Sequence, residues 1–175
     1  VATTLIVDDS RPTTVKQRFR SKGKTLLRVS HLHQSTISPS LQSSILKNIK
    51  SIIDKIDLLV FSDFNYGCLP QYLVDEISNL AKSNNVMLAA DSQSSSQIGD
   101  ISRFHAMNII TPTEREARIG TRNNEDGLVV LAEELQSQSL AHNILLKIGE
   151  EGFLIHAGNS ERDDWLTDRI PALNS

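Results

Sequence analysis

The periodicity of hydrophobic and polar positions changes near residue 39. Before it, short extended stretches flank a turn at residues 21–24, where Gly23 suits a tight loop. This pattern predicts a β-hairpin over residues 13–30, with residues 4–8 as a further strand candidate. After residue 39, apolar side chains recur at spacings of one, three and four up to Ile56. That spacing predicts a long amphipathic helix over residues 41–56.

From residue 57 onward, apolar runs alternate with segments of helical period. Four runs have the length of a strand: residues 57–62, 86–90, 108–111 and 143–148. Three segments have helical periodicity: residues 69–81, 113–119 and 124–135, with Asn124 as the expected cap of the last. Continuously apolar strands are typical of parallel sheets covered on both faces. The alternation therefore predicts an α/β fold with helices on both faces of a parallel sheet, followed by a turn at residues 149–152 and an antiparallel strand.

Composition narrows the class of protein. The 175 residues are 39% hydrophobic and 22% charged, with a net charge of -3 and one cysteine. This balance disfavours a nucleic-acid partner, and one cysteine excludes an internal disulfide framework or a cysteine-rich zinc site. The longest apolar runs are far too short to cross a bilayer. We expect a cytoplasmic protein without a membrane partner.

Polar residues follow each predicted strand, where open parallel sheets bind their ligands. Candidate residues at these strand ends are Asp63, Asn65, Asp91, Thr113, Glu116, Gly149 and Gly152. Each position also has a purely structural interpretation. Residues 63–67 suit an Asx turn, residues 91–96 a solvated loop, Thr113 with Glu116 a capping box, and residues 149–152 a hairpin turn. The local patterns leave both interpretations open.

The hairpin segment is basic. Lys16, Arg18 and Arg20 share one face at strand period, which suits either an anionic ligand or a solvated strand face. Gly23-Lys24-Thr25 resembles the end of a P-loop, but the required upstream glycine is replaced by Arg18 and the segment lies in a hairpin. These residues do not predict a P-loop.

Four segments, taken in order, resemble one known family. Residues 11–18 (RPTTVKQR) and 26–29 (LLRV) resemble the lid hairpin of bacterial heptose 7-phosphate kinases, which are ribokinase-like (PfkB-type) carbohydrate kinases. Residues 62–70 (SDFNYGCLP) are similar to that family's S-D-Y-N-K-G-x-L segment. Residues 109–117 (IITPTEREA) resemble I-T-P-N-x-x-E-A, and residues 147–152 (KIGEEG) resemble T-x-G-x-x-G. The resemblance covers nearly the whole chain.

The resemblance implies a ribokinase-like parallel sheet flanked by helices, with a β-hairpin lid. Residues 1–33 would form the lid region and residues 34–175 the α/β core. The implied activity is ATP-dependent, Mg²⁺-assisted phosphoryl transfer to a hydroxyl of a sugar or sugar phosphate similar to heptose 7-phosphate. Lid hairpins of this family often pair between subunits, which implies a homodimer.

The resemblance also assigns roles to residues. Those implied for the sugar phosphate are Arg11, Lys16, Arg18, Arg28, Asp63 and Asn65. Those implied for the nucleotide are Asp91, Thr113, Glu116, Lys147, Gly149 and Gly152. Glu116 would also organise Mg²⁺ through water, because Mg²⁺ usually keeps several of its waters.

Several positions depart from the family pattern. Ser30 stands where Asp is usual, Thr113 where Asn is usual and Lys147 where Thr is usual, and residues 91–93 (DSQ) replace D-P-K. These departures motivate an alternative, a non-catalytic ligand-binding or regulatory protein with a kinase-like sheet. A different doubly wound nucleotide-binding domain would explain the alternation but not the motifs.

The family's remaining motifs are expected outside these 175 residues. The G-A-G-D segment with the catalytic Asp would follow Ser175, and the first strand, with a sugar-binding Asp and a Gly-Gly pair, would precede Val1. The resemblance therefore implies a central fragment, incomplete at both ends, whose isolated chain does not turn over.

Overall fold

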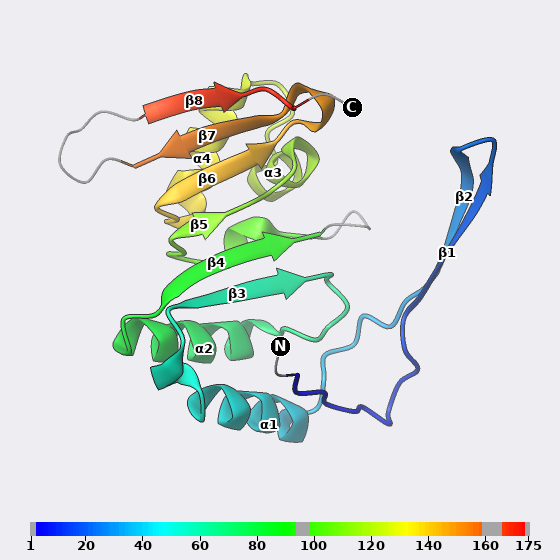
Figure 1. Ribbon diagram of the computed structural model, residues 1–175, viewed down its shortest axis with the longest axis vertical. Helices are drawn as coiled ribbons and strands as arrows, with labels where there is room; N and C mark the ends of the chain where they lie inside the picture. Colours follow the sequence, from blue (N-terminus) through cyan, green and yellow to red (C-terminus); the bar gives the residue numbers. More distant parts are fainter. Residues whose placement is uncertain (1–2, 94–98, 159–165, 174–175) are drawn as a thin grey trace.

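The computed structural model describes residues 3–93, 99–158 and 166–173. A β-hairpin stands apart from a six-stranded sheet (Figure 1). The hairpin consists of β1 (Val15–Ser21) and β2 (Lys24–His31), which pair antiparallel as predicted. Residues 4–8, the further strand candidate, form no strand. Asp8 instead forms an ion pair with Arg11 at 2.9 Å.

Each strand of the main sheet pairs with its neighbours in sequence. The strands are β3 (Leu58–Asp63), β4 (Met87–Ser92), β5 (Ile109–Ile110), β6 (Asn143–Lys147), β7 (Phe153–Ala157) and β8 (Leu166–Ile170). They lie in the order β3-β4-β5-β6-β7-β8. Pairing is parallel from β3 to β6 and antiparallel from β6 to β8. The predicted antiparallel return at β7 is confirmed, whereas β8 was not predicted.

The described ranges also contain four helices and three short 3-10 turns. The helices are α1 (Pro39–Lys50), α2 (Gln71–Ser83), α3 (Glu114–Thr121) and α4 (Leu128–Ser139). The turns are η1 (Ile53–Lys55), η2 (Ile101–Arg103) and η3 (Gly149–Glu151). Buried side chains of helices and strands, among them Leu73, Leu88, Ile110 and Leu131, form one core. None of the helices in the described ranges is long and apolar enough to cross a bilayer.

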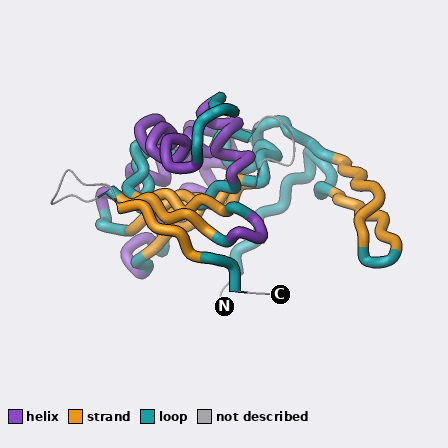
Figure 2. Tube along the Cα trace, turned by 90° about the horizontal axis from the view of Figure 1, so that it is seen from above, coloured by secondary structure: helices purple, strands orange, loops and turns teal. Residues whose placement is uncertain are grey.

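The sheet is buried on one face, which corrects the prediction of helices on both faces. Phe61 and Leu88 are buried, whereas Val60 and Met87, which point to the opposite face, are 55% and 51% exposed. The cause is topological. Parallel crossovers are right-handed, and successive crossovers that progress in one direction along a sheet, as they do here, place their helices on the same side. Most of the helical segments accordingly lie on one side of the strands (Figure 2).

Two helix boundaries differ from those predicted. α1 ends at Lys50, not near Ile56, and the C-cap residue Ser51 closes its last turn by donating from its hydroxyl and its backbone N–H to carbonyl oxygens of that turn. α4 begins after Gly127, and Asn124 is not its cap. The Asn123 side-chain oxygen accepts hydrogen bonds from the backbone of Glu125 and Asp126, which folds residues 123–126 into a turn.

Candidate functional site

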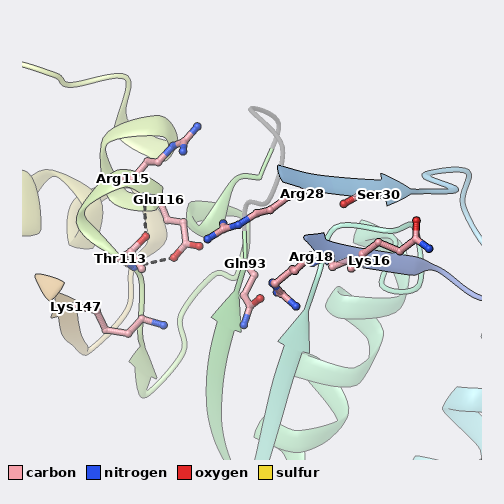
Figure 3. Close-up of a pocket in the computed structure, with 10 residues that line it drawn as sticks. Lys16, Arg18, Arg28, Ser30, Gln93, Thr113, Arg115, Glu116 and Lys147 are labelled. Atoms are coloured by element: carbon pink, nitrogen blue, oxygen red, sulfur yellow. Dashed lines mark hydrogen bonds between the residues drawn. The ribbon is translucent and has the colours of Figure 1, made fainter. Parts of the chain in front are cut away.

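A cavity of about 480 Å³ lies between the hairpin and the carboxyl ends of the parallel strands. The hairpin lines it with Lys16, Gln17, Arg18, Arg28 and Ser30. The core lines it with Gln93, Thr113, Arg115, Glu116 and Lys147. Figure 3 shows Arg18 and Arg28 extending from the hairpin toward the core, and Lys147 extending from the opposite side. The structure thus brings together two segments far apart in the sequence.

The cavity is strongly cationic. Among the described residues that line it, five of ten are Lys or Arg, and one, Glu116, carries a carboxylate. A cleft lined by one sign of charge concentrates ligands of the opposite sign. Arg presents a planar fork that suits phosphate oxygens, and Lys acts as a compact point charge. The cavity is therefore suited to a ligand that carries several negative charges.

Lys147 is held at the mouth of the sheet by Asp91. Its Nζ donates to Asp91 Oδ1 at 2.7 Å, and Thr111 Oγ1 donates to the same oxygen at 2.9 Å. An ammonium group has three N–H donors, so the bond to Asp91 leaves donors for a ligand. Both partners of the ion pair are about one-third exposed. Asp91 thereby orients Lys147, which also lines the cavity.

Thr113 and Glu116 form the predicted capping box at the start of α3. Thr113 Oγ1 accepts from the Glu116 backbone N–H at 3.3 Å, and Glu116 Oε2 accepts from the Thr113 N–H at 2.7 Å. Both residues also line the cavity. The structural and the functional interpretation of this pair are therefore compatible.

Binding of Mg²⁺ would depend on oxygen atoms of the ligand as much as on side chains of the protein. Within the described residues, no three His, Cys, Asp or Glu side chains gather closely enough to hold a metal ion. Glu116 is also partly engaged by its capping bond. These residues fit a hydrated ion held chiefly by phosphate oxygens, with Glu116 contacting its waters, and they do not fit a cage of protein ligands.

Asp63 lies outside the cavity lining, in a buried ion pair. Its side chain is 3% exposed, and Oδ2 accepts from Arg103 Nη2 at 2.7 Å. Its Oδ1 accepts from the Asn65 backbone N–H at 3.0 Å, which is the Asx turn considered above. Arg103 also donates to the Leu69 carbonyl and stacks on Phe104. Asp63 thus joins η2 to the loop after β3, and its role toward a sugar remains a prediction.

Arg11 lies at the base of the hairpin, also away from the cavity lining. Its Nη1 donates to the carbonyl oxygens of Ser35 and Tyr66, both at 2.9 Å, and Nη2 lies 3.2 Å from Cys68 Sγ. These contacts join the segments before and after the hairpin to the loop after β3. In this structure Arg11 fixes the base of the hairpin.

The remaining candidates, Asn65, Gly149 and Gly152, do not line the cavity. Asn65 Nδ2 donates to Ser92 Oγ and to the carbonyl of Gln93, a lining residue. Gly149 and Gly152 both have positive φ. A Cβ on Gly152 would lie 2.1 Å from the Ile170 carbonyl oxygen, so the backbone of β8 occupies the space that this glycine leaves. Residues 94–96, part of the polar loop considered above, lie outside the described residues.

Sequence reasoning placed six of the lining residues and missed others. It identified Lys16, Arg18, Arg28, Thr113, Glu116 and Lys147 as ligand-binding candidates. It assigned no role to Gln17, Gln93 or Arg115. Arg115 carried a usable signal, since it lies in the first turn of a helix that directly follows a strand, and such positions face the ligand side of the sheet.

Comparison of the sequence with known proteins identifies relatives that share one description. No family model matches the chain. The bifunctional protein HldE of Helicobacter hepaticus (strain ATCC 51449 / 3B1) is 27% identical over 158 residues, which cover 89% of this chain and 32% of that protein. The bifunctional protein HldE of Shewanella sp. (strain W3-18-1) is 30% identical over 152 residues, which cover 86% of this chain and 30% of that protein. The chain thus spans about a third of these relatives' length.

Solved structures show the same fold. Phosphofructokinase-2 from Escherichia coli, in complex with fructose-6-phosphate, matches with a TM-score of 0.64 and 14% identity, over 93% of this chain and 52% of that chain. Arabidopsis thaliana ribokinase, complexed with ribose and ATP, matches with a TM-score of 0.56 and 12% identity, over 92% of this chain and 49% of that chain.

Proposed function

We propose, because this chain is related to HldE and has the fold of the ribokinase-like carbohydrate kinases, that it forms part of the site of a sugar-phosphate kinase. The reaction is ATP-dependent phosphoryl transfer to a sugar hydroxyl, with a substrate similar to heptose 7-phosphate. The chain supplies the lid and the strand ends that face the nucleotide.

The observation that carries this proposal is the division of the cations into two groups. Lys16, Arg18 and Arg28 come from the hairpin, whereas Arg115 and Lys147 come from the core. Phosphoryl transfer between a nucleotide and a phosphorylated sugar brings two anionic ligands together, and catalysis depends on holding and neutralising them. The hairpin group suits the phosphate that the sugar already carries. The core group suits the nucleotide polyphosphate.

Four residues that line the cavity then have defined roles. Arg18 and Arg28 bind and orient the sugar phosphate, and Lys147 places an ammonium group at the polyphosphate. Mg²⁺, when bound with the nucleotide, would neutralise phosphate charge, and Glu116 would contact its waters. Closure of the hairpin would exclude water from the reacting groups.

Direct ligand binding tests the proposal. Isothermal titration calorimetry would compare heptose 7-phosphate with unphosphorylated heptose, and ATP with adenosine, each in the presence of Mg²⁺. We expect the phosphorylated ligand of each pair to bind at least ten-fold more tightly than its unphosphorylated counterpart. Added salt should weaken the binding of the phosphorylated ligand.

A variant of the hairpin tests the same proposal. Arg18→Ala should reduce sugar-phosphate affinity. Arg20→Ala is the matched control, because Arg20 lies on the same strand and donates to the Gly23 carbonyl without lining the cavity. Equal affinity for phosphorylated and unphosphorylated ligands would contradict the proposal.

We further propose that turnover needs the G-A-G-D segment expected outside these residues. A coupled ADP-release assay with Mg-ATP and heptose 7-phosphate should therefore detect no turnover by the 175-residue chain. Clear turnover would overturn this point while leaving the binding proposal intact.

The hairpin also suits pairing with a second copy of the chain. Opposed residues Phe19 and Leu27 are 51% and 55% exposed, and Val15 is 46% exposed. A two-stranded hairpin is marginally stable by itself, and it gains stability by covering such a surface. Sedimentation should show a dimer that Phe19→Ser with Leu27→Ser dissociates. A monomeric native chain would contradict this proposal.

A further inference from the structure

We propose that Phe64 and Tyr66, the aromatic pair, are positioning residues that hold the Lys16 ammonium group at the cavity and couple the lid to the core. The inference rests on the proposed function, since it concerns how the lid presents a cation to the sugar phosphate. Neither aromatic residue lines the cavity.

The aromatic pair and Lys16 form a compact cluster. The two rings are stacked, with centroids 6.1 Å apart and an interplanar angle of 21°. Lys16 Nζ lies 5.3 Å from the Phe64 centroid and 5.1 Å from the Tyr66 centroid. Both distances fall within the range of about 6 Å in which a cation is attracted to a ring face. One ammonium group is therefore held by two rings at once.

The choice of aromatic partners has a chemical consequence. A carboxylate would orient Lys16 but would also neutralise it and occupy an N–H donor. A ring face orients the cation through its quadrupole and leaves both the charge and the N–H donors for phosphate oxygens. Across the described ranges, no carboxylate lies within ion-pair distance of Lys16. Lys16 thus reaches the cavity oriented by the two rings and with its N–H donors directed at a ligand.

The loop that carries the aromatic pair is anchored to the base of the lid. Arg11 donates to the Tyr66 carbonyl at 2.9 Å, and the Ile37 N–H donates to the Gly67 carbonyl at 3.1 Å. A Cβ on Gly67 would lie 2.1 Å from the Ser35 carbonyl oxygen, so the loop and the segment after the hairpin are in close backbone contact. The aromatic pair therefore has a fixed place relative to the lid.

The same loop is anchored to the cavity wall. The Asn65 side chain, between the two aromatic residues in sequence, donates to Ser92 Oγ at 3.1 Å and to the Gln93 carbonyl at 3.0 Å. Gln93 lines the cavity beside the core cations. The contacts of Lys16 thus link the lid, through this loop, to the end of β4. Lys16 is therefore already positioned by the core, through the aromatic pair, when an anion binds in the cavity.

The test removes the ring faces while keeping apolar bulk. We expect Phe64→Leu with Tyr66→Leu to weaken sugar-phosphate binding about ten-fold, as measured by calorimetry, and to leave ATP binding unchanged. Phe64→Tyr should bind as the native chain does, because it keeps a ring face at the same position. In a Lys16→Ala background, the two Leu substitutions should cause no further loss, since the interaction they remove is already absent. A further ten-fold loss in that background would overturn the proposal.

A spectroscopic measurement separates this inference from the proposed function. Ring currents should shift the NMR resonances of the Lys16 terminal methylene group upfield in the native chain, and the shift should vanish in the double Leu variant. If native protein binds no sugar phosphate but shows this shift, the proposed function fails while the positioning of Lys16 stands. Resonances of Lys16 that are unchanged by the substitutions would overturn the positioning itself.

Discussion

Lys147 and Asp91 form a 2.7 Å ion pair that joins the end of β6 to the end of β4. The two strands are separated in the sheet by β5. Thr111, which follows β5, donates to the same Asp91 oxygen and so brings the third strand end into the contact. A charged group is therefore fixed where three parallel strands end, the position at which open sheets bind ligands.

Replacement of Lys147 should affect ligand binding more than stability. Lys147→Thr introduces the residue usual in the family and removes one cation from the cavity. We expect ATP affinity measured by calorimetry to fall about ten-fold, as for loss of a charge-assisted hydrogen bond. The free energy of unfolding in urea should change by less than about 1 kcal/mol, because partly exposed ion pairs contribute little. Lys82→Thr, in the last turn of α2, is the matched control. Unchanged ATP affinity would contradict the nucleotide role.

Replacement of Asp63, unlike that of Lys147, should mainly affect stability. Because its carboxylate is buried against Arg103, Asp63→Ala leaves a partly buried guanidinium group without its partner. We expect the free energy of unfolding, measured in urea, to fall by about 3 kcal/mol. Asp75→Ala removes an exposed carboxylate that accepts from Gln71, and should change stability by less than about 0.5 kcal/mol. A small effect at Asp63, comparable to that at Asp75, would show that the buried pair is not a structural requirement.

The cap of α3 allows structure and function to be separated at one position. Thr113→Ala removes the side-chain oxygen that accepts from Glu116 and should lower stability by about 1 kcal/mol. Thr113→Asn keeps a good cap and introduces the residue usual in the family, so stability should be preserved. If Asn also raises ATP affinity, Thr113 marks an altered nucleotide preference. Thermal unfolding and calorimetry measure the two effects on the same variants. A Thr113→Ala variant as stable as the native chain would contradict the role of the cap.

Acid should destabilise the protein through His156. Its side chain is fully buried, with Nδ1 2.8 Å from Thr167 Oγ1, and burial lowers its pKa below the ordinary value of about 6.5. The unfolded chain therefore takes up a proton at higher pH than the native chain. The contribution of His156 to stability is complete above pH 6.5 and is lost as pH falls toward the lowered pKa.

Urea unfolding across pH 5–8 measures this dependence. His156→Gln should reduce the decline of stability below about pH 6.5, because Gln does not titrate. His31→Gln is the control and should retain the native decline, since His31 is exposed on the hairpin. An unaltered decline in the His156 variant would assign the acid sensitivity to other groups.

The sequence predicted the positions of helices and strands better than it predicted which faces of the sheet are buried. Alternating periods located the hairpin and the parallel strands, because apolar spacing reflects local backbone geometry. The apolar runs were wrongly taken to mean that both faces are covered. Leu58 and Val60 are apolar yet about half exposed, and the side that helices cover depends on the direction in which strands are added.

The candidate site was predictable where residues follow strands and not where distant residues meet. Thr113 follows a strand directly, so topology alone placed it at the ligand-binding edge, whereas Lys147 was identified only through the resemblance of residues 147–152. Asp63 has its partner Arg103 40 positions away in sequence, and periodicity carries no information about such a pairing. The contact of Lys16 with the aromatic pair was likewise not predicted, because it depends on the position of the hairpin relative to the loop after β3.

The agreement between strand order and chain order has a kinetic consequence. Since every strand from β4 to β8 pairs with the one made just before it, the sheet can grow by successive addition in the direction of synthesis. Short sequence separations between contacting elements favour rapid folding, because little loop entropy is lost at each step. The hairpin closes through β1 and β2 alone and can form independently of that growth. The ligand cavity, which needs both parts, would therefore be among the last features of the molecule to appear.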